Sequence, residues 1–440
     1  MGLKRAEPRA VHGPYKVLVV GLNYAPDFIG VPKYTTELCE ELVRRGHSVE
    51  VVTAPPYYPS WRIPDAYRGG WRSGILNGVR VSRAPIFVPA HPRGLTRLLH
   101  LVSFSLSAFP PALVAAVARR PDVVMVIAPS LISAPVGLCA AWLAGARSWL
   151  HVQDFEVDAA FELGMLKGDG ARRVAQKVEA FLLRAFDRVS TISGAMRLLL
   201  LKKGVAENAA IEFRNWVDVD AVTMRPDGRT AYRDELRIPP DHAVALYSGN
   251  MAGKQGLEVL ADLAAKLEAG GAKVTVILCG QGPLRPVLED ACAGRGNVRF
   301  LDLQPSERLP ELLATADVHL LPQRAEAADL VLPSKLAGML ASGRPIVAMA
   351  REGTGLSFEV EGCGLVVPPG DAEAMTAAVL RLTDDDGLRH ELALAARSRA
   401  EQRWRLSTVI DGFEAELERL LAGAKASGVE GQPGEAGQLP

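Results

Sequence analysis

Apolar and polar positions follow two different periods along most of this chain. Short apolar runs predict buried strands, and between them apolar residues recur every three or four positions, which is typical of helices. Between the expected strands at 16–21 and 49–53, Leu38 and Leu42 predict a helix over 35–45 that Gly46 closes. Strand–helix–strand alternation predicts a parallel, doubly wound α/β sheet.

The alternation occurs in two series, which predicts two similar α/β halves. The first series has strands at 16–21, 49–53, 123–127, 148–152 and 188–192, and Ser193 is expected to cap the next helix. The second series has strands at 244–248, 273–279, 298–301, 318–321 and 346–349. A segment rich in proline and charge, 218–240, is expected to link the two series.

These series define the expected domains. We expect an N-terminal extension over 1–13, a first Rossmann-like domain over 14–216 and a second over 217–405. A helix over 406–422 is expected to pack back, and the Gly-, Ala-, Glu- and Gln-rich segment 423–440 is expected to be a disordered tail. In such a pair of sheets, the expected ligand site is the cleft between the strand ends.

One apolar segment, 95–118, is long enough to cross a membrane. Pro110, Pro111, His100 and several serines within it favour a broken pair of helices instead. We expect packed helical structure with one face against a membrane surface, and spanning is the least favoured alternative.

Composition narrows the function classes. The chain has 440 residues with 50 basic and 50 acidic side chains, so it lacks the basic excess of a nucleic-acid-binding protein. Its five cysteines have no metal-ligand spacing and are expected to be reduced core thiols of a cytosolic protein. The first fourteen residues lack the apolar stretch of a signal peptide.

A polar loop between two apolar strands, 318–321 and 346–349, carries Arg324, Asp329, Ser334 and Lys335. Ligands of open α/β sheets bind at the carboxyl ends of strands, and cations near a helix start suit a phosphate. The loop therefore indicates a nucleotide or sugar-phosphate ligand. A charged loop that only solvates the end of the sheet is the alternative.

Three further strand ends carry glycines, which permit close backbone approach to a ligand. The first loop contains Gly21, Asn23, Asp27, Gly30 and Lys33; the second contains Gly249, Asn250, Lys254 and Gln255; the third contains Gly280 and Gly282, with Pro283 expected at the first helical position. Lys254 could stabilise a leaving diphosphate as a point charge. None of the loops is a dinucleotide or Walker fingerprint, and ordinary strand–helix turns are the alternative.

Another strand end gathers four polar side chains, which favours catalysis over a solvated loop. His151, Gln153 and Asp154 close the strand at 148–152, and Glu156 follows. Asp154 or His151 could orient or deprotonate an acceptor hydroxyl group.

Together these segments resemble glycosyltransferase family 4, whose members have the two-domain GT-B fold, and in particular its colanic acid biosynthesis group. The resemblance extends over about 16–400 and rests on seven segments: Gly21–Pro26, Thr53–Pro59, His151–Asp154, Thr191–Ser193, Tyr247–Gly256, Gly280–Gly282 and Leu332–Lys335. It implies transfer of a sugar from a nucleotide donor, with retention, to a lipid-linked saccharide acceptor at the inner membrane surface. No cofactor and no metal are implied.

The resemblance also implies roles for residues. The donor would lie against the second half with its diphosphate near Lys254 and Lys335, and the acceptor would meet Asp154 and the loop 21–30.

The chain departs from the family pattern in three places. Asn250 replaces the usual arginine after Gly249, the glutamate pair seven residues apart is absent, and Gln153 replaces the usual histidine before Asp154. Asp329 is a candidate for the first glutamate, and Lys335 and Gly338 lie in the region of the second.

Two alternative functions stay open. A sugar-nucleotide epimerase would share the two-half fold, but it needs paired carboxylates and a histidine around one sugar. A non-catalytic subunit could bind a partner through the same cleft, and the missing glutamate pair is its best support.

Overall fold

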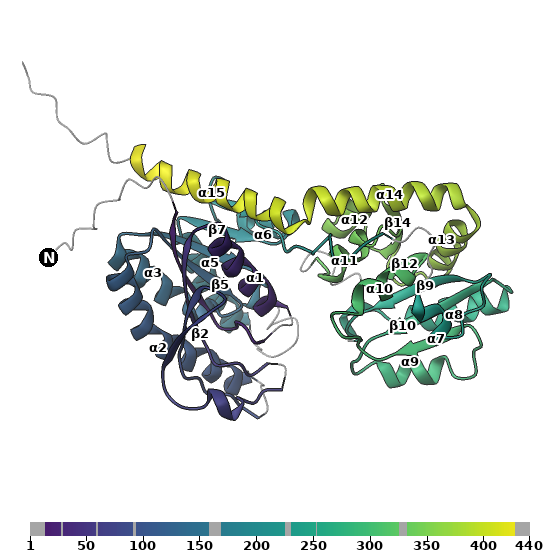
Figure 1. Cartoon of the computed structure of the whole chain (residues 1–440), viewed down its shortest axis with the longest axis horizontal. Helices are drawn as coiled ribbons and strands as arrows, with labels where there is room; N and C mark the ends of the chain where they lie inside the picture. Colours follow the sequence, from purple (N-terminus) through teal and green to yellow (C-terminus); the bar gives the residue numbers. More distant parts are fainter. Residues whose placement is uncertain are drawn as a thin grey trace, which may run out of the picture. The chain divides into compact units, whose positions relative to one another are not determined.

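The structure is a computed structural model that describes residues 14–27, 30–58, 60–90, 94–157, 169–224, 230–251, 253–324 and 332–426. Its elements can be followed in Figure 1. The chain forms two compact units. Unit 1 extends to Phe213 and resumes at Ile410, and unit 2 is Arg214–Val409.

Unit 1 is built on an eight-stranded sheet in the order β3-β4-β2-β1-β5-β6-β7-β8, parallel except for the β3–β4 hairpin. The strands are β1 Lys16–Gly21, β2 Ser48–Thr53, β3 Arg72–Leu76, β4 Val79–Arg83, β5 Val123–Ala128, β6 Arg147–Val152, β7 Arg188–Thr191 and β8 Ala210–Glu212. The helices are α1 Val31–Arg44, η1 Asp65–Tyr67, α2 Gly94–Arg119, η2 Leu131–Ser133, α3 Ala134–Ala144, α5 Asp169–Arg184 and α6 Gly194–Lys202.

Unit 2 is built on a six-stranded parallel sheet in the order β11-β10-β9-β12-β13-β14. The strands are β9 Ala243–Ser248, β10 Val274–Cys279, β11 Val298–Leu301, β12 Val318–Leu321, β13 Ile346–Met349 and β14 Gly364–Val367. The helices are α7 Ala231–Glu235, η3 Gly253–Gln255, α8 Glu258–Ala269, α9 Arg285–Ala291, α10 Leu309–Thr315, α11 Lys335–Ala341, α12 Gly355–Val360, α13 Ala372–Asp384 and α14 Asp386–Arg403. The last helix, α15, is Leu406–Ala426.

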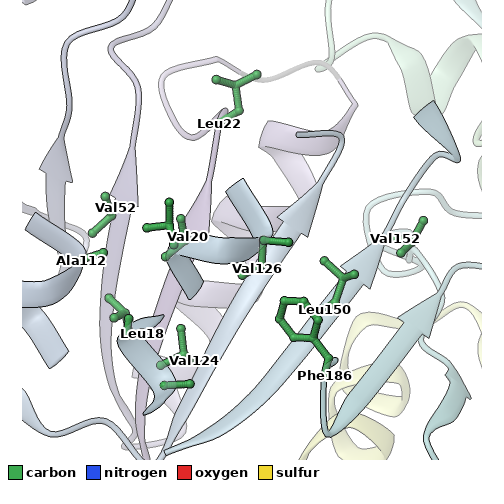
Figure 2. Packing of buried hydrophobic residues seen from close by; sticks show 14 of the residues in the cluster. Leu18, Val20, Leu22, Val52, Ala112, Val124, Val126, Leu150, Val152 and Phe186 are labelled. Carbon is green, nitrogen blue, oxygen red and sulfur yellow. The ribbon is translucent and has the colours of Figure 1, made fainter. Parts of the chain in front are cut away.

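The parallel strands of unit 1 are apolar because both faces of the sheet are covered. On one face, Leu18 and Val20 of β1 pack in one cluster with Ala112 of α2 and Val126 of β5, as Figure 2 shows. Val17 and Val19, which point the other way, are buried as well. Burial on both faces explains why these strands are nearly continuous apolar runs.

Helix α2 corrects the expectation of a broken helix pair, because it runs unbroken over 26 residues with Pro110 and Pro111 inside it. A proline at position 111 cannot donate to the carbonyl four residues earlier, which belongs to Ser107. The indole Nε1 of Trp71 donates to that carbonyl oxygen at 2.8 Å instead. Side-chain compensation of this kind lets the helix continue through the prolines.

Several smaller expectations were wrong. The expected linker 218–240 contains helix α7, where Tyr232 is fully buried and its hydroxyl bonds Gln304 at 2.8 Å. Helix α9 begins at Arg285, so Pro283 precedes it and Pro286 takes the early helical position. Cys139 is exposed on α3, whereas the other four cysteines are buried core thiols as expected. The β3–β4 hairpin and the edge strands β8 and β14 were missed.

Helix α15 lies against the first unit through aromatic rings. Phe413 lies 4.8 Å from the ring of Trp149 and 5.0 Å from that of Phe213, measured between centroids. The helix continues to Ala426, past the expected end at 422.

A close approach of helix α3 to strand β5 in unit 1 yields a stability prediction. A Cβ at Gly137 of α3 would lie 2.1 Å from Cγ2 of Val126 in β5, whereas a Cβ at Gly412 of α15 would meet nothing within 4 Å. We expect Gly137→Ala to destabilise unit 1 by about 1–3 kcal/mol through overpacking. The control Gly412→Ala should be neutral or stabilising by up to about 1 kcal/mol. Urea unfolding measures both, and equal stabilities would contradict the packing argument.

Candidate functional site

The predicted donor-binding residues lie at the carboxyl edge of the unit 2 sheet. The loops after β9 and β10 carry Gly249 and Gly280, the loop after β12 carries Arg324, and Lys335 begins α11. Strands β10, β9 and β12 are neighbours in the sheet, so their carboxyl ends are adjacent. The structure therefore brings these residues, which are far apart in the sequence, to one edge of the unit 2 sheet.

The glycines of the β9 and β10 loops let two backbones touch. A Cβ at Gly280 would lie 1.9 Å from the carbonyl oxygen of Gly249, and one at Gly282 would lie 2.4 Å from that of Met251. Both glycines also have φ near +150°, a region that side chains disfavour. Gly280 and Gly282 thus have a structural requirement, and it shapes the edge on which Gly249 and Asn250 lie.

The ammonium group of Lys335 is held between these loops. Its Nζ lies 4.2 Å from the ring centroid of Tyr247 and 3.3 Å from Oε1 of Gln255. The Tyr247 hydroxyl lies within hydrogen-bonding distance of the Asn250 carbonyl, at 2.7 Å, and of Gln255 Oε1. A Cβ at Gly249 would be only 3.5 Å from the lysine Nζ, so glycine there leaves the ammonium group room.

Lys335 has no carboxylate partner among the described residues. Burial lowers the pKa of Lys335 to about 7, although the Tyr247 ring and the Gln255 oxygen both favour the charged form. Buried charges are normally paired, so the arrangement suits an anionic ligand.

The other predicted cations differ from Lys335. Arg324 is half-exposed, and its Nη2 lies 2.6 Å from Oε1 of Glu258 in α8, so it already has a carboxylate partner. Gly256 lets the two loops approach, because a Cβ there would lie 3.1 Å from Cγ of Arg324. Ser334 is exposed and makes no capping bond. The side chain of Lys254 and the whole of Asp329 lie outside the described residues.

In unit 1, the polar strand end after β6 separates into a buried part and an exposed part. Asp154 is exposed, whereas His151 and Gln153 are buried. Nε2 of His151 lies 3.1 Å from Nε2 of Gln153, and its Nδ1 lies 2.8 Å from Oγ of Ser190. An amide nitrogen can only donate, so His151 accepts at Nε2 and carries its proton at Nδ1.

This network does not support His151 as a base. Complete burial lowers the pKa of His151 to about 3, and its one free ring nitrogen is occupied by Gln153. The Ser190 hydroxyl also accepts a hydrogen bond from the indole of Trp149 at 2.8 Å. This bond holds Ser190 in place as the partner of His151. His151 therefore positions Gln153, and Asp154 is the exposed carboxylate at this strand end.

The predicted acceptor loop follows β1 at the same edge of the unit 1 sheet. Asp27 is buried and accepts a weak bond, 3.5 Å, from the Tyr57 backbone nitrogen and another from the Asn23 side chain. Burial raises the pKa of the Asp27 carboxyl despite these bonds. Gly30 caps α1 with φ +76°, and Lys33 forms a surface pair with Glu37 at 3.9 Å. Gly21 is the last residue of β1.

Sequence reasoning missed two parts of the unit 2 site. The first is the ring of Tyr247, which lies beneath Lys335 and was predicted only as part of a motif. The second is Glu258, which lies beside Arg324 and was not predicted. Tyr247 occupies an inward position of a buried strand, where apolar residues prevail, and a tyrosine there signals a hydroxyl that needs a partner.

A pH dependence follows from the buried amine of Lys335. In the unfolded chain the pKa is about 10.4, so between about pH 7 and 10.4 only the unfolded chain holds the proton. The wild-type protein should therefore gain stability as the pH rises through this window. Lys335→Met removes the buried charge, so it should be more stable than the wild type near pH 6, with a difference that shrinks toward pH 10.

Melting temperatures of both proteins across this pH range measure the effect. The control Lys266→Met, at a half-exposed lysine paired with Glu373, should show no such convergence. A difference between Lys335→Met and wild type that stays constant with pH would contradict the argument.

Two family models match the chain, one for each unit. The model described as "Glycosyl transferase 4-like domain" matches residues 30–216, and the one described as "Glycosyl transferases group 1" matches residues 242–385. The chain is also 41% identical over 375 residues to a protein of Escherichia coli (strain K12) named "Putative colanic acid biosynthesis glycosyl transferase WcaI". The match covers 83% of this chain and 91% of the relative.

Solved structures share the fold at low sequence identity. Sucrose-phosphate synthase from Thermosynechococcus elongatus aligns with a TM-score of 0.70 at 18% identity, over 93% of this chain and 100% of that one. Anabaena HepE in complex with UDP and glucose aligns with a TM-score of 0.65 at 16% identity, over 92% and 100%. The predicted fold, two Rossmann-like α/β domains of the GT-B type, is confirmed.

Proposed function

This chain belongs to glycosyltransferase family 4, and from that premise we propose that it moves a sugar from a nucleotide-sugar donor to a lipid-linked saccharide acceptor. The transfer retains the configuration of the anomeric carbon and serves exopolysaccharide biosynthesis at the inner face of the cytoplasmic membrane. The likeness to WcaI supports the pathway, and the UDP complexes of the HepE structures support the donor class.

The unpaired ammonium group of Lys335 is the observation that carries the proposal. A largely buried cation without a carboxylate among the described residues requires an anion, and a nucleotide sugar brings a diphosphate. The adjacent backbone of Gly249 leaves space beside Nζ, because it has no side chain. Donor binding therefore supplies a negative charge that the described residues do not.

The two units have different roles in the proposed reaction. The bond between the anomeric carbon and the diphosphate oxygen breaks, and the leaving diphosphate gains negative charge, which Lys335 stabilises more strongly than in the ground state. The acceptor oxygen forms the new bond to the anomeric carbon, and its proton passes to the oxygen of the leaving diphosphate. Asp154, exposed at the end of β6, is the group we assign to orient that hydroxyl, while His151 and Gln153 hold the strand end in place.

A donor screen followed by a transfer assay tests the function. One nucleotide sugar should raise the melting temperature of the wild type, because it binds only the folded state. Lys335→Met and Lys254→Ala should lose most of that stabilisation and lower kcat/KM by a factor of about 10²–10³, which corresponds to roughly 3–4 kcal/mol of transition-state stabilisation. Lys266→Met, a surface lysine of the same unit, is the matched control.

The outcomes separate the alternatives. Free release of an epimerised nucleotide sugar would identify an epimerase, and binding without turnover would identify a binding subunit. Wild-type rates in both lysine variants would refute the assignment of the site while leaving the family unchanged.

We further predict that transfer needs no divalent metal. The described residues contain no group of three or more histidine, cysteine or carboxylate side chains placed to hold a metal ion, and Lys335 can neutralise the diphosphate. Activity should therefore persist in excess chelator. Loss of activity that manganese or magnesium restores, with calcium as a control for simple charge screening, would contradict this prediction.

A further inference from the structure

Helix α2 is apolar on the face that points away from the protein core. Its buried stripe recurs every four residues, at His100, Phe104, Ala108 and Ala112, and packs on the unit 1 sheet. The opposite stripe, which we call the outer stripe, follows the same helical period and is also apolar. It consists of Leu95, Leu99, Val102, Leu106, Leu113 and Val117. A solvated helix would carry polar residues at these positions.

Four residues of the outer stripe, Leu95, Leu99, Leu106 and Val117, are exposed, and Val102 and Leu113 between them are partly buried. The exposed fractions of Leu95, Leu106 and Val117 are 69%, 71% and 60%, so both ends and the middle are open. Beside the middle of α2 lies Trp71, which is itself 59% exposed although its indole nitrogen bonds the helix backbone. An apolar surface of this extent marks an interaction site.

Charge around the stripe indicates the kind of partner. The segment 66–121, which includes the β3–β4 hairpin and α2, contains eight arginines and no aspartate, glutamate or lysine. The chain as a whole has no net charge, so the positive charge of this segment is balanced by acidic residues elsewhere in the sequence. Arg97 and Arg120, at the two ends of α2, are exposed. Arg68 and Arg119 are more than half exposed as well, although they pair with Asp65 and Glu50 at 3.0 Å and 3.7 Å. An apolar stripe with basic surroundings and a tryptophan fits the boundary between lipid headgroups and acyl chains.

Two other occupants fit less well. Spanning the bilayer would pull Phe104 and Ala108, which are completely buried, out of the unit 1 core. A second copy packed symmetrically on the same stripe would bring together two copies of a segment with eight arginines, and the carboxylates of Asp65 and Glu50 already pair with Arg68 and Arg119 within one copy.

We propose that the outer stripe of α2, with Trp71 beside it, docks peripherally on an anionic lipid bilayer surface. The apolar side chains enter the headgroup boundary and the arginines contact lipid phosphates. Docking deepens the proposed function, since it holds unit 1 at the surface that would carry a lipid-linked acceptor, but its evidence is independent of the donor site. The N-terminal end of α2 follows β4, and its C-terminal end precedes β5, so the stripe is fixed to the sheet that carries Asp154.

Sedimentation of the full chain with vesicles tests the proposal. The protein should pellet with vesicles that contain phosphatidylglycerol, remain in solution with phosphatidylcholine alone, and be released by high salt. Leu106→Glu places a carboxylate in the centre of the stripe and should weaken binding by at least about tenfold. The matched control is Leu394→Glu, at a leucine that is 50% exposed on α14 of unit 2, and it should bind like the wild type.

Every other outcome overturns the proposal. Equal binding of both variants would place the membrane contact elsewhere, and no binding of the wild type would leave the stripe without a lipid partner. Release by detergent alone would mean that α2 spans. A wild-type dimer in light scattering that Leu106→Glu dissociates would identify a second copy as the occupant. Melting temperature and stabilisation by nucleotide sugar should be unchanged in both variants, so failure of docking and failure of the proposed function remain distinguishable.

Discussion

Burial of both parallel sheets on both faces is the constraint on which the rest of the structure depends. A strand covered on two sides, such as β1 or β9, has no face left for polar side chains, so polar chemistry is confined to the strand ends. In unit 2 the ends of β10, β9 and β12 are adjacent. The loops that leave them therefore meet, and Lys335 is held where they meet.

Close approach of these loops depends on the absence of side chains. Gly280 and Gly249 touch backbone to backbone, and Gly256 makes room for Arg324. The result is a compact edge in which the ring of Tyr247 and the amide oxygen of Gln255 support a single ammonium group. Because the supporting groups are neutral, the charge of Lys335 stays available for a ligand, whereas Glu258 already neutralises Arg324.

The same constraint operates differently in unit 1. His151 is part of the buried strand, so it is neutral and serves Gln153, while Asp154, one residue beyond Gln153, is exposed. Helix α2 covers the unit 1 sheet with one stripe of small and aromatic residues, and its outer stripe is apolar as well. An amphipathic helix would have been sufficient for the core, so the second stripe needs a partner outside the described fold.

The sequence by itself determined the two series of strands, because buried parallel strands leave continuous apolar runs that no local alternative explains. It also located Lys335 at the start of α11 and Ser193 as a cap, since both depend on neighbours in sequence. The Asn77-Gly78 turn of the β3–β4 hairpin was a readable signal that was overlooked. Only the tertiary structure decided which candidates act as charges. It buried His151, paired Arg324 with Glu258 and placed no carboxylate of the described residues beside Lys335, because each outcome depends on residues brought together from distant loops. It also kept α2 continuous through Pro110 and Pro111, since the bond from Trp71 comes from a hairpin 36 residues away.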